Sequence, residues 1–445
     1  MGCAQSIAAA PNPNEGNLDA TSNMDAASTK STPSSLPRSS STSSSSPYRI
    51  RRKNSGGPSS KRMLVARAKL KRSGSSSSGW TNDRKGKIRS LGRARLNSNK
   101  NQNDSNVCLD PGDPTSPLPG NVSSNDFIMD SYAIGKGSFG FVRLGKHKRT
   151  SLTYAIKQTR KVDVVKKKGM KFVLRERKTL KSINHPFIIK LCGSFQDRSC
   201  LFLVMEYAPG GDLGWLSCRS DNQRLPEDDA RFYAAELLIA LKHLHTVCGV
   251  MHRDIKPDNV LLDAKGHVKL GDFGFARKVD SNGRCQSHLG TPHYLAPEQL
   301  DIHNRAGYTT CVDWWSWAVT VFVLVAGNGP FGKNSDTRYE VYLRVMKSKY
   351  KTPKVFSSSL RKLIKAMFTL KEKKRLTDVN TIMNHSWFAG HVDWVQMEAQ
   401  ETMPPSKPSI VKNGKNNFTK IELRDLENEA DLRVVNENYD VFAGF

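Results

Sequence analysis

The sequence lacks the features that mark a secreted or membrane-spanning protein. None of its eight cysteines stands in a C-x-x-C pair, and no apolar signal core follows Met1. The longest apolar stretch, residues 314–327, is shorter than the ~18 residues that a bilayer-spanning helix needs. We therefore expect a reduced, intracellular compartment and a buried helix at that stretch.

Acidic residues are scarce relative to basic ones. The chain has 41 Asp and Glu against 69 Lys and Arg, a formal charge of +28. Such a balance suits nucleic acid, an anionic membrane or acidic partners, and equally a merely solvated surface. In residues 1–125 only Tyr48 and Trp80 are aromatic, so the interleaving typical of nucleic-acid binding is missing. We expect no nucleic-acid partner.

Residues 1–125 also have few large apolar side chains and are rich in Ser, Asn, Pro and Gly, which predicts a disordered basic tail. The start, Met-Gly-Cys-Ala-Gln-Ser, fits the myristoylation pattern at Gly2 and makes Cys3 a candidate for palmitoylation. A single acyl chain binds membranes weakly, and the basic stretch at residues 49–95 would strengthen it. We expect a cytoplasmic protein attached to the cytoplasmic face of a membrane.

Order is expected from residue 126, with one domain at 126–388 and a tail at 389–445. Residues 132–206 alternate as strands do and contain one expected helix, Lys166 to Lys181, whereas 225–388 has the longer period of helices. This pattern predicts an α+β fold with a small antiparallel β lobe and a larger, mainly helical lobe.

A glycine-rich stretch opens the predicted domain. Gly135-Lys-Gly-Ser-Phe-Gly140 with Val142 fits G-x-G-x-x-G-x-V, in which glycines let the backbone approach phosphate oxygens. The chain then returns into a strand that ends at Lys157, which indicates a hairpin over a nucleotide. A lysine among apolar strand residues needs anionic partners, and ATP phosphates and Glu176 are the candidates.

Two further motifs lie 18 positions apart: His252-Arg-Asp254-Ile-Lys256-Pro-Asp-Asn259 and Asp272-Phe-Gly274. A divalent cation on phosphate needs hard oxygen ligands, so Asn259 and Asp272 are the predicted Mg²⁺ ligands. Asp254 would accept the proton of an attacking hydroxyl, and Lys256 would neutralise the transferred phosphate. Any one of these residues could merely cap a turn, but the ordered set indicates phosphoryl transfer.

With these motifs, residues 132–388 resemble the eukaryotic protein kinase family, and Ala296-Pro-Glu298 closes the activation segment as it does there. Lys256 and Gly290-Thr291-Pro are similar to serine/threonine kinases. Asn184-His-Pro-Phe187, Asp313-Trp-Trp315 and the terminal Phe442-Ala-Gly-Phe445 are similar to the AGC group, and closest to catalytic subunits of cyclic-AMP-dependent protein kinase.

The resemblance implies a set of site residues. The nucleotide would contact Ile134, Gly135, Lys136, Gly137, Ser138, Phe139, Gly140, Val142, Ala155, Lys157, Met205, Glu206 and Ala208, and through metal Asn259 and Asp272. A spine would form from Leu180, Leu191, His252 and Phe273. Ser287 would be the phosphorylation site of the activation loop, and Arg253 and Arg277 would bind its phosphate.

The resemblance also implies partners. Substrates would contact Asp212, Asp258 and Thr291, with an arginine three residues before the acceptor at Asp212. An arginine two residues before would meet Asp258 and the position of Val323. A separate regulatory subunit would bind any cyclic nucleotide, since residues 1–125 hold no such domain. Phe442 and Phe445 would pack beside the helix of Glu176.

Three positions depart from this pattern. Val323 lacks the expected carboxylate, Val435 cannot be phosphorylated, and Phe172 replaces a histidine that would link the Ser287 phosphate to the helix of Glu176. We therefore expect that link to be weaker. Three alternatives remain: a pseudokinase scaffold, an AGC kinase that is not regulated by cyclic nucleotide, and an adaptor that acts through its basic tail.

Overall fold

The computed structural model describes residues 118, 122–137, 140–280, 283–287, 289–301, 303–332, 336–407, 421–422, 435, 442 and 445. They belong to one compact unit. Gly2 and Cys3, the basic stretch at residues 49–95, and Ser138 and Phe139 of the glycine loop lie outside the described residues, so what the sequence predicts for them remains a prediction.

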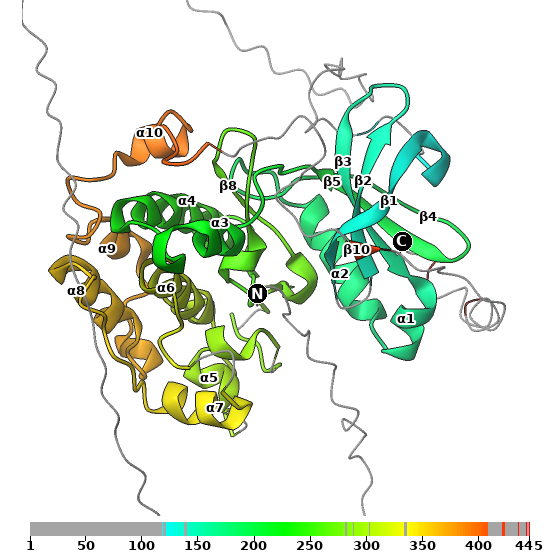
Figure 1. The fold of residues 1–445 in the computed structure, drawn as a ribbon. Helices are drawn as coiled ribbons and strands as arrows, with labels where there is room; N and C mark the ends of the chain where they lie inside the picture. The colour runs from blue at the N-terminus through cyan, green and yellow to red at the C-terminus, as the bar shows by residue number, and fades with distance from the viewer. Residues whose placement is uncertain are drawn as a thin grey trace, which may run out of the picture. The chain divides into compact units, whose positions relative to one another are not determined.

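A six-stranded sheet with antiparallel neighbours forms the first part of the described chain, on the right in Figure 1. Its strand order is β10-β1-β2-β3-β5-β4. The strands are β1 (Phe127–Lys136), β2 (Gly140–His147), β3 (Thr153–Arg160), β4 (Leu191–Gln196), β5 (Cys200–Glu206) and β10 (Ile421–Glu422). β10 thus brings the C-terminal segment to the edge of the sheet.

The sheet is buried on both faces at β5, and the residue pattern shows why. Cys200, Phe202 and Val204 pack into a cluster on one face, whereas Leu201 and Leu203 join the main core on the other. Because successive side chains of a strand point to opposite faces, a strand buried on both sides is apolar throughout.

Two helices follow β3 where the sequence predicts one from Lys166 to Lys181. α1 spans Lys161–Lys166 and α2 spans Met170–Lys181. Lys168 takes a left-handed conformation (φ 51°) and Gly169 donates its N–H to the carbonyl of Val164, which ends α1. The prediction was therefore correct from Met170 onward and wrong at its start, because Lys166 is the last residue of α1 and a turn separates it from α2.

The larger part is mainly helical, as predicted. It contains α3 (Leu213–Arg219), α4 (Glu227–Thr246), α5 (Pro297–Leu300), α6 (Cys311–Ala326), α7 (Arg338–Met346), α8 (Ser358–Met367), α9 (Val379–Met383) and α10 (Trp394–Glu398) (Figure 1). The apolar stretch predicted as a buried helix is α6, and Trp317 on it donates to the carbonyl of Ala234 on α4. The α+β prediction is confirmed.

Two short strand pairs carry the chain between α4 and α5. β7 (Val260–Leu262) pairs with β8 (Val268–Leu270), and β6 (Val250–Met251) pairs with β9 (Arg277–Lys278). The β7–β8 turn is held by Asp263, whose Oδ1 accepts three backbone N–H groups. These ribbons fix the ends of the two segments that hold Asp254 and Asp272.

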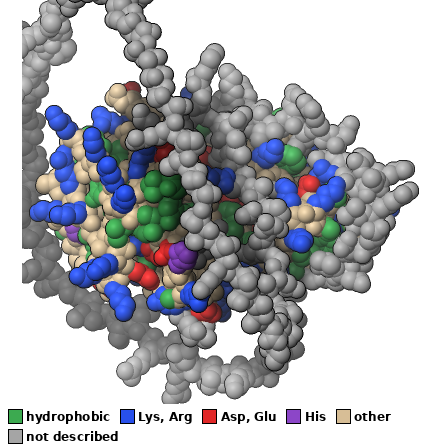
Figure 2. Space-filling view, turned by 90° about the horizontal axis from the view of Figure 1, so that it is seen from below, with side chains coloured by type: hydrophobic (Ala, Val, Ile, Leu, Met, Phe, Trp, Pro, Cys, Tyr) green, Lys and Arg blue, Asp and Glu red, His purple; other side chains and the backbone are tan. Residues whose placement is uncertain are grey.

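Basic side chains project from the helical part on the face shown in Figure 2, where many blue groups lie to the left of a green apolar area. In the described part of the chain, no helix has the length and apolarity required to cross a membrane.

Candidate active site

The ammonium of Lys157 lies where β3, α2 and the segment after β8 meet. Its Nζ donates to Glu176 Oε1 at 2.6 Å and to Asp272 Oδ1 at 3.4 Å. Burial opposes the charge, but the two carboxylates outweigh it and raise the pKa of Lys157. The predicted partner Glu176 is in place, and Asp272 is a second partner.

Asp272 adopts a left-handed backbone conformation (φ 52°) at the start of a short 3₁₀ turn, Phe273–Phe275. Its Oδ1 accepts the N–H of Gly274 at 3.4 Å. Burial raises the pKa of Asp272, but the positive charges of Lys157 and Lys256 outweigh burial. The pKa is therefore lowered overall, and the carboxylate is ionised. An ionised carboxylate is what a divalent cation requires.

The glycine loop is a hairpin between β1 and β2 and not a strand-to-helix turn. Gly135 pairs with Val142, and the N–H of Gly137 donates to the carbonyl of Gly140 at 2.8 Å. A Cβ on Gly140 would lie 1.9 Å from the carbonyl oxygen of Gln158 on β3, so no larger residue fits there. The predicted hairpin is therefore present.

The residues predicted for the purine lie on neighbouring strands. Val142 pairs with Lys157 across β2 and β3, and Ala155 pairs with Met205 across β3 and β5. The side chain of Glu206 is taken up elsewhere, since Oε1 accepts from the backbone of Lys190 and Oε2 from Lys269. Its backbone N–H donates to the carbonyl of Lys190, so the backbone carbonyl of Glu206 is the group left for the contact that the resemblance implies. Ala208 and Ile134 are both buried.

Asp254 is buried, and both oxygens of its carboxylate accept hydrogen bonds. Oδ1 accepts from the hydroxyl of Thr291 at 2.6 Å and from its N–H at 3.1 Å. Oδ2 accepts from Asn259 Nδ2 at 2.9 Å and lies 3.1 Å from Lys256 Nζ, which also donates to the Thr291 hydroxyl at 2.9 Å. Thr291 thus joins the activation segment to the catalytic loop.

A second carboxylate, on Asp313 of α6, fixes the loop that carries Asp254. Its two oxygens accept the N–H groups of His252 (2.8 Å) and Arg253 (2.7 Å), and Oδ2 also meets His245 Nε2 at 2.8 Å. Burial opposes ionisation, but the hydrogen bond and charge of His245 lower the pKa of Asp313. This anchor holds Arg253 at φ 68°, a strained conformation for arginine.

The metal prediction rests on Asn259 and Asp272, and their donor atoms fit Mg²⁺. Both amide hydrogens of Asn259 are used, by the carbonyl and by the carboxylate of Asp254, so its amide oxygen is the atom left for a cation. Within the described residues, no cluster of three or more Asp, Glu, His or Cys could hold a metal alone. A magnesium ion here would need phosphate oxygens as further ligands.

Two of the four residues predicted for the spine are in direct ring contact, and the other two belong to or pack against the main core. The rings of His252 and Phe273 meet edge to face at 4.8 Å, and Leu180 is buried in the same cluster, with Leu191 packed against it. Apolar packing of this kind is also ordinary core packing, so it supports the position of α2 more than any chemistry.

Ser287 and its two predicted arginines are close together, though not in the predicted pattern. Arg253 donates from Nη1 to the Ser287 hydroxyl and from Nε to the carbonyl of Phe275 at 2.7 Å. Arg277 donates instead to the sulfur of Cys285, two residues before Ser287, at 3.4 Å. Sequence reasoning gave Cys285 no role.

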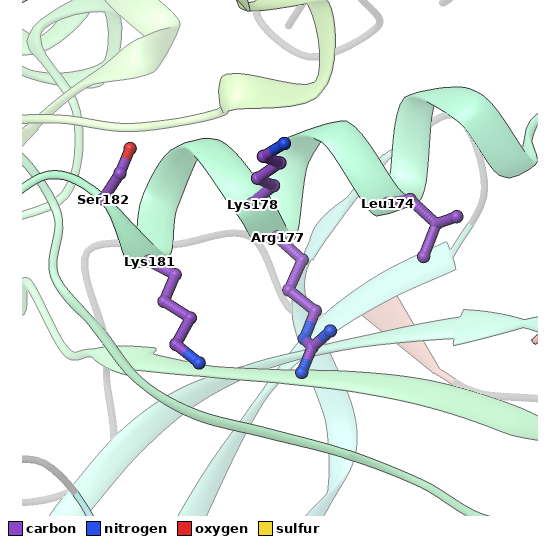
Figure 3. A pocket seen from close by; sticks show the side chains of 5 residues that line it. All are labelled: Leu174, Arg177, Lys178, Lys181 and Ser182. Carbon is purple, nitrogen blue, oxygen red and sulfur yellow. The ribbon is translucent and has the colours of Figure 1, made fainter. Parts of the chain in front are cut away.

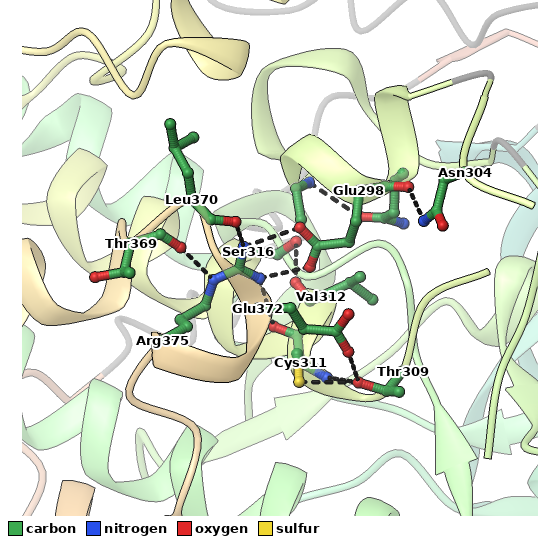
Figure 4. A network of polar contacts seen from close by, with 12 residues as sticks. Glu298, Asn304, Thr309, Cys311, Val312, Ser316, Thr369, Leu370, Glu372 and Arg375 are labelled. Carbon is green, nitrogen blue, oxygen red and sulfur yellow. Dashed lines mark hydrogen bonds and ion pairs between the residues drawn. The ribbon is translucent and has the colours of Figure 1, made fainter. Parts of the chain in front are cut away.

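The end of the activation segment is held by an ion pair that the sequence did not reveal. Arg375 makes a bidentate contact with Glu298, at 2.5 and 2.8 Å (Figure 4). Its guanidinium also lies 4.9 Å from the centre of the Trp315 ring. It also donates to the carbonyls of Thr369 and Leu370 around it. The two partners are 77 positions apart, so no local pattern could have paired them.

Asp212, a predicted substrate contact, begins α3. Its Oδ1 accepts the N–H of Trp215 at 2.7 Å. Burial, with the nearby charge of Asp258, raises the pKa of Asp212 to about 6. A cationic group beside Asp212 would therefore stabilise the charged form of its carboxyl.

The outer side of α2 faces the C-terminal residues. A pocket of about 420 Å³ is lined by Leu174, Arg177, Lys178, Lys181 and Ser182 (Figure 3). Arg177 lies 5.2 Å from the ring of Phe445, and Lys161 lies 5.1 Å from the ring of Phe442, whose carbonyl accepts from Gln196. Both rings are buried.

Arg175 is a charged residue of α2 that sequence reasoning missed. Burial and the charges of Arg253 and Arg277 lower its pKa, whereas Cys285 raises it, so Arg175 faces the Ser287 region. Phe172 lies 5.7 Å away, beneath the guanidinium. The expectation of a weaker link through Phe172 took no account of this neighbouring cation, whose position three residues later on the same face was the available signal.

Residues 129–388 match the family model described as protein kinase domain. The chain is 35% identical to cAMP-dependent protein kinase catalytic subunit 2 of Drosophila melanogaster, covering 70% of this chain and 86% of that one. It is 33% identical to the human cAMP-dependent protein kinase catalytic subunit PRKX, covering 76% and 92%.

A plant relative is similar to a comparable degree. Serine/threonine-protein kinase AtPK1/AtPK6 of Arabidopsis thaliana is 36% identical over 66% of this chain, and the chain spans 62% of that relative's length.

Arg375→Met should destabilise the fold by about 3–5 kcal/mol, because it leaves the Glu298 carboxylate buried without its partner. Urea unfolding of the purified variant measures this. Arg344→Met is the control: its ion pair with Asp336 is much more exposed, and its loss should cost at most about 1 kcal/mol. Equal effects of the two substitutions would contradict the role given to the buried pair.

Proposed function

This chain belongs to the protein kinase family and is a serine/threonine kinase, and from that premise we propose that it phosphorylates arginine-directed protein segments as a catalytic subunit of cyclic-nucleotide signalling. The observation that carries the catalytic part is the contact of Lys157 with both Glu176 and Asp272. A pseudokinase scaffold would not need this arrangement, whereas phosphoryl transfer does.

Each of the residues in the site would have a separate role in phosphoryl transfer. Asp254, held by Thr291 and Asn259, would orient the substrate hydroxyl and take its proton. Lys157 would hold the phosphates of ATP, and Lys256 would neutralise the transferred group. Asn259 and Asp272 would hold Mg²⁺, which when bound neutralises charge on the phosphate oxygens.

Asp272→Ala and Lys157→Met should each lower kcat by at least about a hundredfold, since both residues act on charge that develops in the transition state. Phosphate transfer from radiolabelled ATP to a basic peptide measures this. Thermal unfolding of each variant serves as the control for folding. Near-normal turnover in a folded variant would refute the kinase mechanism.

Substrate choice is proposed from the acids that remain. Asp212 and Asp258 keep their charge, while Val323 supplies none. An arginine at minus three would meet Asp212, and one at minus two would meet Asp258 without the second carboxylate that a planar guanidinium favours. A charge-assisted contact is worth roughly 10- to 150-fold in discrimination.

A positional peptide library at neutral pH should show strong selection of arginine at minus three and weak selection at minus two. Below about pH 6 the selection at minus three should fade, because the raised pKa of Asp212 means that its carboxyl takes up a proton there. The ratio of kcat/KM for paired peptides with and without the arginine separates this effect from any general loss of activity at acid pH.

Two variants control that experiment. Asp212→Asn should give weak, pH-independent selection at minus three, and Val323→Glu should strengthen selection at minus two. Equal and strong selection at both positions by the unaltered protein would show that another acid replaces the one missing at Val323.

Regulation and location form the rest of the proposal. The name catalytic subunit, carried by the fly and human relatives, supports a separate cyclic-nucleotide-binding regulatory subunit as partner. An AGC kinase without such control is the alternative, favoured by the similarity to the plant kinase. The motif at Gly2 and Cys3 and the basic stretch support attachment to the cytoplasmic face of a membrane.

Gly2→Ala should move the protein from the membrane fraction to the soluble fraction, because the myristoyl chain can no longer be attached. Fractionation of cells that express the tagged variant measures the shift. Cys3→Ser is the companion variant, and it should weaken attachment without removing the myristate. An unchanged distribution of Gly2→Ala would leave the basic stretch as the anchor.

A further inference from the structure

Three arginines from three different elements converge on Cys285 in the activation segment. Arg253 follows β6, Arg277 lies in β9 and Arg175 lies in α2. Burial lowers the pKa of Arg175, and the positive charges of Arg253 and Arg277 lower it further. Among the ion pairs between described residues, none joins these three arginines to an Asp or Glu.

The sulfur of Cys285 is the atom to which two of these arginines donate. Arg253 Nη1 is 3.1 Å from Sγ, and Arg277 Nη1 is 3.4 Å from it. The Ser287 hydroxyl lies 3.3 Å from the same sulfur. The backbone of Cys285 exchanges two hydrogen bonds with Tyr308, each 2.8 Å long, and the residue is 3% exposed. The thiol is therefore held in a fixed place against the cations.

The surroundings favour the charged form of this thiol. Burial raises its pKa, but hydrogen bonds with Ser287 and the charge of Arg253 outweigh burial and lower the pKa of Cys285 to about 7. Arg175 and Arg277 add positive charge from α2 and β9. Burial raises the pKa of Tyr308, so its phenol stays neutral and adds no opposing charge.

One hydrogen-bond donor beside Cys285 has no acceptor. Arg253 Nη2 is buried without a hydrogen-bond partner, in a residue that is 1% exposed. An unmade bond at such a donor is costly, and it indicates a site built for one more acceptor than the thiol provides. A phosphate on Ser287 would bring three strongly accepting oxygens to the same guanidinium.

We propose that the Cys285 thiolate is the anion that positions Arg253 and Arg277 while Ser287 is unphosphorylated, and that it gives the unphosphorylated enzyme a basal activity that rises with pH. This inference rests on the proposed kinase function. Arg253 also holds the carbonyl of Phe275, three residues after Asp272, so the charge balance at Cys285 reaches the turn of Asp272. Phosphate on Ser287 takes over the role of the thiolate.

The test compares basal with phosphorylated activity across pH. Protein treated with phosphatase, with Ser287 shown unmodified by mass spectrometry, is assayed by initial rates next to protein phosphorylated at Ser287. The initial rate of the unphosphorylated protein divided by that of the phosphorylated protein should rise as pH increases through about 7 in the unaltered enzyme. Cys285→Ser should lower basal activity on the order of ten-fold and remove the rise, since a hydroxyl stays neutral.

A rescue variant shows whether the effect of Cys285→Ser comes from the lost charge or from altered packing. Cys285→Asp restores a negative charge and should give basal activity that no longer varies with pH near 7. Once Ser287 is phosphorylated, Cys285→Ser should match the unaltered enzyme, because phosphate then supplies the charge. Cys248→Ser makes the same chemical change at a half-buried thiol whose pKa burial raises, and it should leave the ratio unchanged.

A direct titration of the Cys285 thiol tests this inference independently of the proposed kinase function. The ultraviolet absorbance of the thiolate, taken as the difference between the unaltered protein and Cys285→Ser, should appear near pH 7 even without substrate. No thiolate there, or a Cys285→Ser defect that persists after phosphorylation, would overturn the role of Cys285. Absence of activity in phosphorylated, folded enzyme would refute the proposed function instead.

Discussion

The largely buried ammonium of Lys157, whose side chain is 14% exposed, is the constraint on which the active site depends. A lysine between apolar strand neighbours is stable as a cation only if carboxylates meet it, and Glu176 and Asp272 do so from two other elements. Each of those carboxylates is in turn placed by backbone structure: Glu176 by α2, and Asp272 by a left-handed turn. The charge balance at one atom therefore ties together β3, α2 and the segment after β8, and displacement of any of them leaves a buried charge without its partner.

Helix α2 transmits that constraint outward. Successive residues of an α-helix point about 100° apart, so Arg175, Glu176 and Arg177 face three directions. Glu176 faces Lys157, Arg177 lies against the ring of Phe445, and Arg175 faces the arginines beside Ser287. Three consecutive side chains thus connect the catalytic lysine, the C-terminal residue and the activation segment to one rigid element. A change at either outer contact acts on Glu176 through the helix.

The sequence predicted those parts of the site in which the chemistry lies within a short motif. The glycine hairpin, the loop from His252 to Asn259 and the turn at Asp272 each keep their residues within a few positions, so residue type and spacing suffice. The anchors were missed because their partners are remote: Asp313 lies 60 positions from Arg253, and Arg375 lies 77 from Glu298. The helix predicted from Lys166 failed for a local reason, since no periodicity rule reports the left-handed turn at Lys168. Cys285 carried no motif, and the arginines that donate to its sulfur are remote in the sequence from it or lie in another element.

The charge of the whole chain and the charge of the proposed substrate site have opposite signs, and this decides which one a basic peptide meets. A net charge of +28 repels an arginine-rich peptide at long range. At physiological salt, however, that repulsion is screened beyond about 8 Å. Asp212 and Asp258 act at contact distance, and Asp212 is partly buried, so its interaction with a cation is screened less and burial already disfavours its charge. A guanidinium that arrives there relieves an existing electrostatic cost, so binding gains more than the same contact would yield between two solvated groups. A basic surface is therefore compatible with selection of basic substrates, because that selection depends on two acids and not on the average charge.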